Sequence, residues 1–351
     1  MPRRPHALRW ALLALLLGVL VTACTDSGPD CDDPDDCTLR ELGETVDLRI
    51  GAAVRTDALE DDATYRTLAS EQFASLTPHA ELTWKQIEPE PYEYNFEPAD
   101  RIVELAEAND QEIRGHNLFW GQRKRTPDHV NDTRDPTSLR AAMRLHAETV
   151  GSRYQGRIQR YDVVNEPFVY DTVERADSIY QEVFGDDWIA LAFELAHEVD
   201  PDAELWINMT GASRVDGKHA AQLAVVSDLL AAGIPVHGVG LQTHIELDGW
   251  DATQYAGFIA DYEALGVEVA LTEVDYPAFG QGASDDETAR VYGEMVARCA
   301  ESEACVEVTF WSWHDAYTST DRLNEDATPG LFDPNGERKP LVADFFLESD
   351  Q

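Results

Sequence analysis

The sequence predicts a single α/β domain folded as a (β/α)8 TIM barrel. The first observation is that, from residue 46 onward, short apolar runs alternate with longer amphipathic stretches of helical periodicity. The second is that eight strand-like runs extend over about 300 residues, the usual extent of one closed barrel of parallel strands. The third is that no glycine-rich phosphate-binding turn follows the first apolar run, which disfavours the alternative of an open doubly wound sheet.

The first 23 residues are predicted to be an export signal and not part of the folded domain. Three arginines precede an apolar run of 14 residues, which is too short to span a bilayer comfortably. The run ends in Val21-Thr22-Ala23-Cys24, which resembles a bacterial lipobox, a signal that is cut before the cysteine so that Cys24 carries the lipid. An ordinary signal peptide cut at the same small residues is the alternative. We therefore expect an exported protein, either secreted or held at the membrane only through this lipid.

Residues 24–44 predict an acidic flexible tether, so that the folded domain is expected over 45–351. Six aspartates stand among glycine and prolines in this segment, a composition that repels itself and cannot bury apolar surface. Export provides an oxidising compartment, which favours two local disulfides with six-residue spacing. The pairs are Cys31 with Cys37 and Cys299 with Cys305. Free thiols are the alternative for the first pair, and no zinc site is expected because no histidine lies near either pair.

The elements of the barrel follow in order. Strands are expected at Val46–Val54, Ser75–Leu82, Glu112–Phe119, Ile158–Asn165, Ala203–Met209, Val236–His244, Val267–Val274 and Val306–Trp311. Helices are expected at Pro98–Ala108, Pro136–Tyr154, Ala176–Val199, Lys218–Ala232, Ala252–Leu265 and Asp285–Ala300. Asp251 and Ser284 stand where N-caps belong, with Gln254 and Glu287 at capping-box spacing.

The charge balance excludes several classes of partner. The chain has 67 acidic and 27 basic side chains, a formal net charge of -40, and a pI near 4.3. A surface this negative repels phosphate backbones and anionic lipid, so neither nucleic acid nor a basic membrane-docking patch is expected. The hydrophobic fraction of 43% and the many aromatic residues indicate that most of the chain folds.

Polar and aromatic side chains gather where seven of the eight expected strands end, which is where a barrel of this kind places its active site. They are Glu81, His116, Trp120, Asn165, Glu166, Asn208, Gln242, His244, Glu273, Asp275 and Trp311. One such residue would more often point to solvent by chance, but candidates on seven strands make chance a poor explanation. Among them, Glu166 and Glu273 each follow an apolar strand, and two carboxylates facing one cavity are the equipment for glycoside hydrolysis.

An ordered set of segments makes the interpretation specific. They are SLTPHAELTW (75–84), EPADRIVELAEANDQEIRGHNLFW (97–120), RYDVVNE (160–166), ELWIN (204–208), GIPVHGVGLQTH (233–244), LTEVD (271–275), CAESEACVEVTFW (299–311), LFD (331–333) and KP (339–340). In order and spacing, residues 48–346 resemble glycoside hydrolase family 10, the endo-β-1,4-xylanases. The resemblance implies a barrel, a retaining mechanism on β-1,4-xylan, and a disulfide between Cys299 and Cys305.

The resemblance also implies roles for individual residues. Glu166 resembles the acid/base and Glu273 the nucleophile, while Asn165 would hydrogen-bond the 2-hydroxyl of the sugar being cleaved. His244 and Asp275 resemble a pair that orients the nucleophile and keeps it ionised. The pocket for that sugar would be lined by His116, Trp120, Gln242, His244 and, as a stacking floor, Trp311. This chemistry needs neither metal nor cofactor, and we expect a monomer whose partner is a polysaccharide or oligosaccharide.

Departures from the family pattern gather on one side of the predicted site. The residues that usually grip the next sugar toward the non-reducing end are replaced by His79, Ala80 and Thr83, and a second stacking Trp is replaced by Ser319. Trp313 is a candidate to supply a ring instead. The segments after two strands also differ, as Gly121-Gln122-Arg123 and Met209-Thr210. We therefore expect an altered non-reducing-side subsite, and two alternatives stay open: the same mechanism on another β-linked glycan, such as β-glucan or a substituted oligosaccharide, or a non-catalytic glycan-binding lipoprotein.

Overall fold

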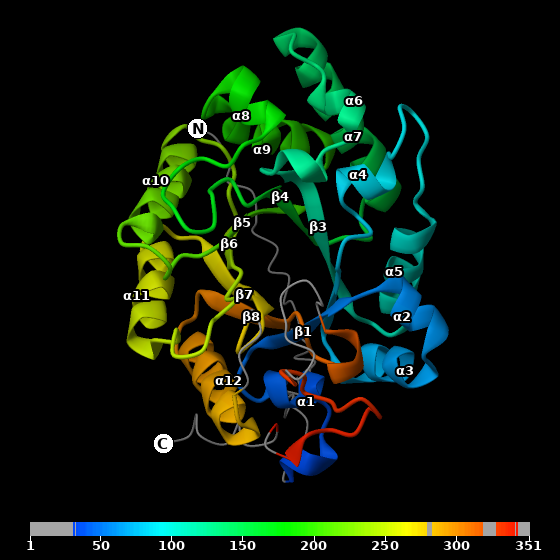
Figure 1. Ribbon diagram of the computed structural model, residues 1–351, viewed down its shortest axis with the longest axis vertical. Helices are drawn as coiled ribbons and strands as arrows, with labels where there is room; N and C mark the ends of the chain where they lie inside the picture. The colour runs from blue at the N-terminus through cyan, green and yellow to red at the C-terminus, as the bar shows by residue number, and fades with distance from the viewer. Residues whose placement is uncertain (1–30, 32, 279–282, 319–327, 341, 343–351) are drawn as a thin grey trace, which may run out of the picture.

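The computed structural model describes residues 31, 33–278, 283–318, 328–340 and 342. Eight parallel strands pair in sequence order, and β8 pairs with β1, so the sheet closes into a barrel with the helices outside it (Figure 1). The (β/α)8 prediction is confirmed. The strands are β1 (Arg49–Val54), β2 (Ser75–Pro78), β3 (Glu112–Trp120), β4 (Arg160–Asn165), β5 (Glu204–Met209), β6 (Gly238–Leu241), β7 (Glu268–Val274) and β8 (Cys305–Phe310).

Five of the six expected helices are present among those that cover the barrel, and the sixth is divided in two. The helices that cover the barrel are α2 (Thr56–Asp61), α3 (Ala63–Gln72), α4 (Trp84–Ile87), α5 (Glu97–Ala108), α6 (Asp128–Asn131), α7 (Pro136–Tyr154), α8 (Ile179–Phe184), α9 (Asp187–Val199), α10 (Lys218–Ala231), α11 (Ala252–Glu263) and α12 (Asp285–Ala300). The carboxylate of Asp251 and the hydroxyl of Ser284 accept hydrogen bonds from the backbone N–H groups three residues on, which confirms both N-caps. Among the described residues, none of the helices has the length and apolar character needed to cross a bilayer.

Three expected boundaries are wrong for local reasons. The helix expected over 176–199 is two helices, because Gly185 has φ +60° and ends α8 before α9 begins. The strand expected to reach Leu82 ends at Pro78, and the chain then turns into α4. The strand expected to reach His244 ends at Leu241, since Thr243 has φ +59° and cannot continue an extended strand.

The tether predicted over residues 24–44 is too long, because its last residues fold into helix α1 (Leu39–Glu44). Thr38 and Glu41 form a complete capping box at its start. Leu39 and Leu42 are 1% and 2% exposed, so the helix buries apolar side chains that an acidic tether would not have. The guanidinium of Arg40 donates to the carbonyls of Phe73 and Asn109, which precede β2 and β3, so α1 lies at the N-terminal ends of the strands.

Both expected disulfides are present. Cys31 is bonded to Cys37, and Cys299 is bonded to Cys305, where the second bond joins the end of α12 to the start of β8. The first bond closes a short loop whose carbonyls at Pro34 and Cys37 accept hydrogen bonds from Arg338. The chain is thus fastened to the domain from Cys31 onward. The predicted signal segment and Cys24 lie outside the described residues.

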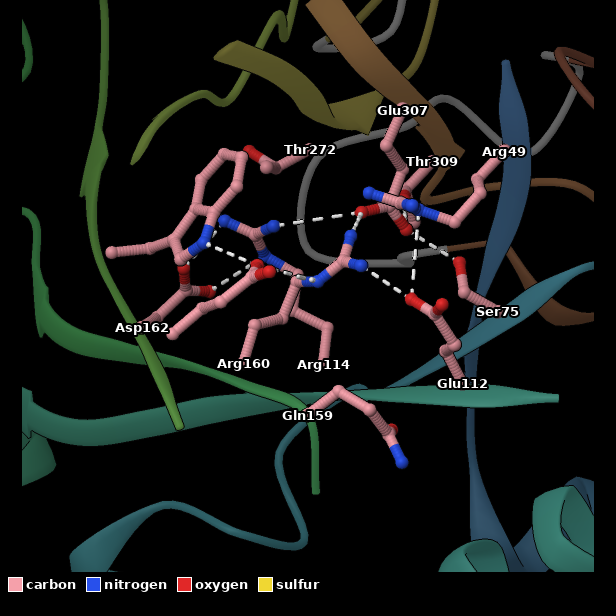
Figure 2. A network of polar contacts seen from close by, with 12 residues as sticks. Arg49, Ser75, Glu112, Arg114, Gln159, Arg160, Asp162, Thr272, Glu307 and Thr309 are labelled. Carbon is pink, nitrogen blue, oxygen red and sulfur yellow. Dashed lines mark hydrogen bonds and ion pairs between the residues drawn. The ribbon is translucent and has the colours of Figure 1, made fainter. Parts of the chain in front are cut away.

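The N-terminal half of the barrel interior holds a layer of buried charge (Figure 2). Arg160 Nη1 donates to Glu307 Oε2 at 2.6 Å, and Arg114 Nη1 lies 3.6 Å from the same oxygen. The hydroxyls of Ser75 and Thr309 donate to the other oxygen of Glu307. Burial alone would raise the pKa of Glu307, but Arg160 and Arg114 outweigh it and lower the pKa to about 2. The interior beneath the strand ends is therefore ionic rather than apolar.

Candidate active site

Glu166 stands directly after β4, at the C-terminal end of the barrel. Its φ of 51° is left-handed, an unusual conformation for a residue with a Cβ, and it turns the chain out of the strand. Its N–H donates to the Asn208 carbonyl at 3.0 Å, and the side chain is buried, with the residue 4% exposed. The Gln242 amide donates to Oε1 at 3.1 Å, and the Gln122 amide donates to Oε2. Amides thus contact both carboxyl oxygens.

Glu273 lies in β7 and is held by a different set of donors. Asn208 Nδ2 donates to Oε1 at 2.7 Å, and His244 Nε2 lies 2.9 Å from Oε2. His244 Nδ1 lies 2.8 Å from Asp275 Oδ1, so the imidazole stands between two carboxylates. If both carboxylates are ionised, both contacts are hydrogen bonds only when both ring nitrogens carry a proton, so ionised Glu273 and Asp275 would favour a charged imidazole between them.

A network of amides connects the two glutamates. Asn208 Nδ2, which donates to Glu273, also donates to Asn165 Oδ1 at 2.9 Å. Gln242 Nε2, which donates to Glu166, lies 3.3 Å from the same Asn165 oxygen. Thr272 donates to Asn208 Oδ1 at 2.7 Å and fixes the orientation of that amide. The two carboxylates therefore belong to one hydrogen-bonded group, whereas the sequence predicted only that they face one cavity.

Aromatic rings line the site beside these carboxylates. Trp311 is 7% exposed and lies between three imidazoles, with ring centroids 4.9 Å from His79, 5.5 Å from His116 and 6.4 Å from His244. His116 also packs edge-on against Trp120 at 5.7 Å. Trp311, His116 and His244 therefore lie together as expected. His79, one of the residues that departs from the family pattern, adds a ring over this floor.

Trp313 does not take the place of the missing second tryptophan. It is 1% exposed, its indole N–H donates to the Ala53 carbonyl at 2.7 Å, and its ring packs on Tyr65 and Phe73 in the core. The suggestion that Trp313 supplies a ring to the site is wrong, because its polar atom and both of its faces are already used. Ser319 lies outside the described residues.

Several polar atoms of the site lack a hydrogen-bond partner among the described residues. They are Asn165 Nδ2, Gln242 Oε1 and Trp120 Nε1. Buried polar atoms are costly to leave unpaired, and a polyhydroxyl ligand in the site would supply both donors and acceptors. These three atoms belong to residues that the sequence analysis placed in a sugar pocket.

The charged layer reaches the site through Asp162. Arg114 donates to both of its oxygens, at 2.7 and 3.2 Å, and His116 Nδ1 lies 2.9 Å from Oδ2. Burial alone would raise the pKa of Asp162, but Arg114 and His116 outweigh it and lower the pKa. The orientation of His116 is therefore set by charges in the barrel interior. Sequence reasoning missed this connection, although Arg114 and His116 share one face of β3.

Two cavities are lined in part by residues that contact the site. The larger, about 600 Å³, lies beside the residues that follow β1 and β2. Its lining includes Arg55, Asp57, His79, Ala80, Glu81 and Arg101. The smaller, about 370 Å³, lies beside the loop 167–178, which starts directly after Glu166. Its lining includes Gln122, Lys124, Phe168, Val169, Tyr170 and Asp177. Each cavity thus shares a residue with the surroundings of the site, because His79 contacts Trp311 and Gln122 donates to Glu166.

Comparisons with known proteins agree with this geometry. The model of glycosyl hydrolase family 10 matches residues 38–346. Endo-1,4-beta-xylanase B of Thermotoga neapolitana is 31% identical over 340 residues, covering 95% of this chain and 92% of its own. Endo-1,4-beta-xylanase A of Phanerodontia chrysosporium is 32% identical over 304 residues, covering 84% of this chain and 72% of its own.

Solved structures give the same result. Native xylanase 10B from Thermotoga maritima superposes with a TM-score of 0.80 at 28% identity, covering 89% of this chain and 98% of that one. Xylanase 10B from Thermotoga petrophila in complex with xylobiose superposes with a TM-score of 0.81 at 28% identity, covering 90% and 99%. The matched family model includes α1 and every strand of the barrel. The chain is a glycosidase and belongs to glycosyl hydrolase family 10.

Proposed function

We propose that this protein is a retaining endo-β-1,4-xylanase with an altered non-reducing-side subsite. The observation that carries the proposal is the pair Glu166 and Glu273, each held by its own donors within one amide network at the ends of β4 and β7. The relatives named above are endo-1,4-beta-xylanases, and one related structure contains xylobiose. The polar and aromatic composition of the site suits a neutral polysaccharide.

The donors around each carboxylate fit the two halves of a double displacement. Glu273 must be ionised to attack the anomeric carbon, and hydrogen bonds from Asn208 and the charged His244 favour that form. Glu166 must first give a proton to the leaving oxygen and then take one from water. Its partners Gln122 and Gln242 are amides, which donate to a carboxylate and, after rotation, accept from a carboxylic acid. They therefore suit a group that changes its charge in every cycle.

The sugar at the cleavage point would rest on Trp311, with the free polar atoms of Asn165, Gln242 and Trp120 facing its hydroxyls. A C–H face packs on an aromatic ring while hydroxyls need planar polar partners. Each hydrogen bond of this kind contributes roughly 0.5–1.5 kcal/mol net. His116, held by Asp162, and His244, held by Asp275, complete the pocket.

The altered subsite is assigned to the cavity beside β2. His79 and Ala80 line it, whereas the Thr83 hydroxyl donates to the Ala80 carbonyl at 2.8 Å and stays within its own turn. Loss of about three hydrogen bonds to sugar would cost about 1.5–4 kcal/mol of binding, a 10- to 1,000-fold loss in affinity. Glu81 is no substitute, because its carboxylate accepts from the N–H groups of Thr56 and Ala80. We therefore expect weak binding of unsubstituted xylose units on this side.

This cavity also favours a second candidate, the same mechanism on another β-linked glycan. Ala80 leaves room where the family usually has a larger side chain, and that room suits a hexose or a branched sugar. A non-catalytic glycan-binding role fits less well, because Glu166, Glu273 and their partners are all in place.

The test begins with a product profile of the purified protein on xylan, mixed-linkage glucan and cellulose, with proton NMR recording the anomer released first. Retention and xylo-oligosaccharides from xylan are the expected result. Glu273→Ala should abolish turnover, and Glu166→Ala should slow substrates with poor leaving groups far more than those with good ones. No hydrolysis of any β-1,4-glycan or aryl β-glycoside would overturn the proposal, whereas glucan products alone would favour the second candidate.

The altered subsite has its own test. Changing His79→Glu, Ala80→Asn and Thr83→Lys together restores the usual residues, and it should lower KM for xylotetraose at least about tenfold. KM for an aryl β-xyloside, which carries no sugar on that side, should stay unchanged and serves as the control. Equal KM values for xylotetraose before and after the change would show that these positions do not determine binding.

We also propose that the protein is exported and acts as a monomer, with a lipid on Cys24. The support is the sequence of residues 1–24 and the disulfides at Cys31–Cys37 and Cys299–Cys305, which fit an oxidising compartment. Metabolic labelling with a lipid precursor should tag the wild-type protein and leave Cys24→Ser unlabelled.

A further inference from the structure

Lys218 is a buried cation that the catalytic scheme above does not use. It is the first residue of α10 and is 0% exposed, although lysines are seldom fully buried. Its Nζ donates to the Val169 carbonyl at 2.5 Å and to the Tyr170 carbonyl. A buried ammonium is costly unless its protons are satisfied, and these two carbonyls satisfy most of them.

The two carbonyls belong to the loop 167–178, which starts directly after Glu166. The loop has internal hydrogen bonds, from Val169 N–H to the Glu174 carbonyl at 2.9 Å and from Ala176 N–H to the Pro167 carbonyl at 3.0 Å. The carbonyls of Val169 and Tyr170 accept hydrogen bonds from Lys218, and the Val169 carbonyl also accepts one from the Thr172 N–H at 3.4 Å within the loop. Lys218 therefore connects the loop directly to α10 through two hydrogen bonds.

Tyr170 connects the loop to the residues around Glu273 as well. Its ring centroid lies 5.7 Å from Lys218 Nζ and 5.2 Å from the Arg214 guanidinium. Its hydroxyl donates to the His244 carbonyl at 3.4 Å. The same loop thus contacts α10, the segment before α10, and the residue that supports Glu273. Displacement of the loop would be felt at both catalytic carboxylates.

Gly211 shows that the surroundings make room for this contact. Its φ is +64°, and a Cβ there would lie 2.6 Å from the Tyr170 carbonyl oxygen and 3.1 Å from Lys218 Nζ. Any side chain at this position would therefore push against both partners of the contact. The loop after β5, which carries Gly211, and the loop after β4 approach each other closely at the ammonium.

The charges that face Lys218 come from three elements. Asp171 in the loop and Glu166 at the end of β4 attract it, while Arg214 ahead of α10 repels it. Burial lowers the pKa of Lys218 to about 8, and the two carboxylates counteract that effect. The positive charge is consequently coupled to the charge on Glu166.

We propose that Lys218 is a positioning residue: it pins the loop 167–178 so that Glu166 meets the leaving-group oxygen and the 370 Å³ cavity keeps its shape for the departing sugar. The inference rests on the proposed glycosidase mechanism. It predicts a defect confined to steps that need proton donation or a bound leaving sugar. Attack by Glu273 on a substrate with a good leaving group needs neither.

The experiment compares Lys218→Met with the wild-type protein on two substrates. kcat/KM for xylotetraose, whose leaving group needs the acid, should fall about 100-fold, as expected when a catalytic group is misplaced by about 1 Å. kcat/KM for 2,4-dinitrophenyl β-xylobioside, which reports only the steps up to departure of the leaving group, should fall less than about threefold, because this leaving group departs without a proton. Lys85→Met, which removes an exposed lysine paired with Asp128, is the matched control and should leave both values unchanged.

Two further variants keep the proposal testable if Lys218→Met folds poorly. Gly211→Ala leaves the lysine in place and disturbs its contact, so it should give the same selective loss. Lys218→Gln retains two N–H donors and should recover part of the activity on xylotetraose. Equal losses on both substrates, or no loss, in folded variants would overturn the role of Lys218. Failure of the wild-type protein to cleave either substrate would instead overturn the proposed function.

Discussion

At the scale of single residues, His244 shows how much depends on one side chain between two carboxylates. Its ring contacts Glu273 on one side and Asp275 on the other, at 2.9 and 2.8 Å. Asp275 touches no reacting atom in the proposed mechanism, and it acts by holding a proton on the ring. This is the arrangement in which an orienting acid contributes strongly to rate through its neighbour.

We predict that Asp275→Asn lowers kcat/KM on the order of 10- to 1,000-fold, because an amide holds the charged imidazole less well than a carboxylate. The measurement is steady-state kinetics on an aryl β-xyloside with a good leaving group, which reports attack by Glu273. Asp200→Asn is the control, since Asp200 is also buried, at 4% exposure, but precedes β5 at the opposite end of the barrel. A fall of similar size in both variants would contradict the role given to Asp275.

Gly121 carries a second prediction at this scale. A Cβ on Gly121 would collide with the Glu166 carbonyl and lie 3.0 Å from Pro167 Cα, because the Gly121 N–H donates to the Asn165 carbonyl at 2.7 Å. Gly121→Ala should therefore displace the Glu166 backbone and lower kcat/KM on the order of 10- to 100-fold.

The control for Gly121 is Gly257→Ala in α11, where a Cβ would meet nothing within 4 Å. That change should leave activity intact and stabilise the helix by up to about 1 kcal/mol. Kinetics and urea unfolding on both variants would separate a local effect at Glu166 from a general effect of the added methyl group. Full activity in Gly121→Ala would show that the loop adapts without cost.

At the scale of elements, sequence patterns predicted the bounds of a helix well where one of its faces is apolar and its start carries a cap. Helices such as α7 and α12 have caps and apolar faces, and their bounds agree with the structure to the residue. The pattern failed where a single backbone conformation ends an element, as at Gly185 and Thr243, because composition does not reveal φ. The pattern also failed to predict α1, because the six aspartates just before the helix indicated a flexible segment, although two leucines of α1 are buried.

We predict that Leu42→Ala lowers the free energy of unfolding by about 2–4 kcal/mol, because it leaves a cavity where α1 packs. A flexible tether would show no such effect. The measurement is urea unfolding followed by fluorescence, with Asp36→Ala in the exposed segment before α1 as a control that should stay within about 0.5 kcal/mol. Equal unfolding curves for the wild-type protein and Leu42→Ala would show that α1 does not contribute to the stability of the domain.

At the scale of the whole molecule, the barrel is organised around charge. The residues at the strand ends could be predicted, since each is polar or aromatic, stands where an apolar run ends, and belongs to an ordered set of segments. Glu307, Arg160 and Arg114 were not, because in a chain with 67 acids a charged residue inside a strand reads as one that faces solvent. Lys218 was missed for a related reason: at the first position of a helix, a lysine gives no sign that it is buried.

We predict that Glu307→Gln lowers the free energy of unfolding by about 3–5 kcal/mol at pH 7, since it removes the buried carboxylate that Arg160 and Arg114 share and leaves them with partners such as Glu112 and Asp162. Glu198→Gln, which removes an exposed partner of Arg144, should cost less than about 1 kcal/mol. Urea unfolding of both variants provides the comparison. A small effect at Glu307 would mean that the arginines find other partners.

The difference in unfolding free energy between the wild-type protein and Glu307→Gln should depend on pH, and the lowered pKa of Glu307 gives the direction. The folded-state pKa of Glu307 is lowered from 4.5 to about 2, so its ionised form stabilises the fold fully above pH 4.5. That contribution is lost as the pH falls from 4.5 toward 2. The difference in unfolding free energy between the wild-type protein and Glu307→Gln should therefore narrow over this range. A difference that stays constant down to pH 2 would contradict the lowered pKa.

The position of α1 has one more consequence. The disulfide at Cys31 and helix α1 fasten the start of the folded chain to the N-terminal ends of the strands, whereas Glu166 and Glu273 stand at the opposite ends. The seven residues from Cys24 to Cys31 can span at most about 25 Å. A lipid on Cys24 would therefore hold the N-terminal ends of the strands close to the bilayer. Glu166 and Glu273, at the opposite ends, would then face away from the membrane. An enzyme anchored in this way would hydrolyse an insoluble polysaccharide at the cell surface, and the sugars would be released next to that cell.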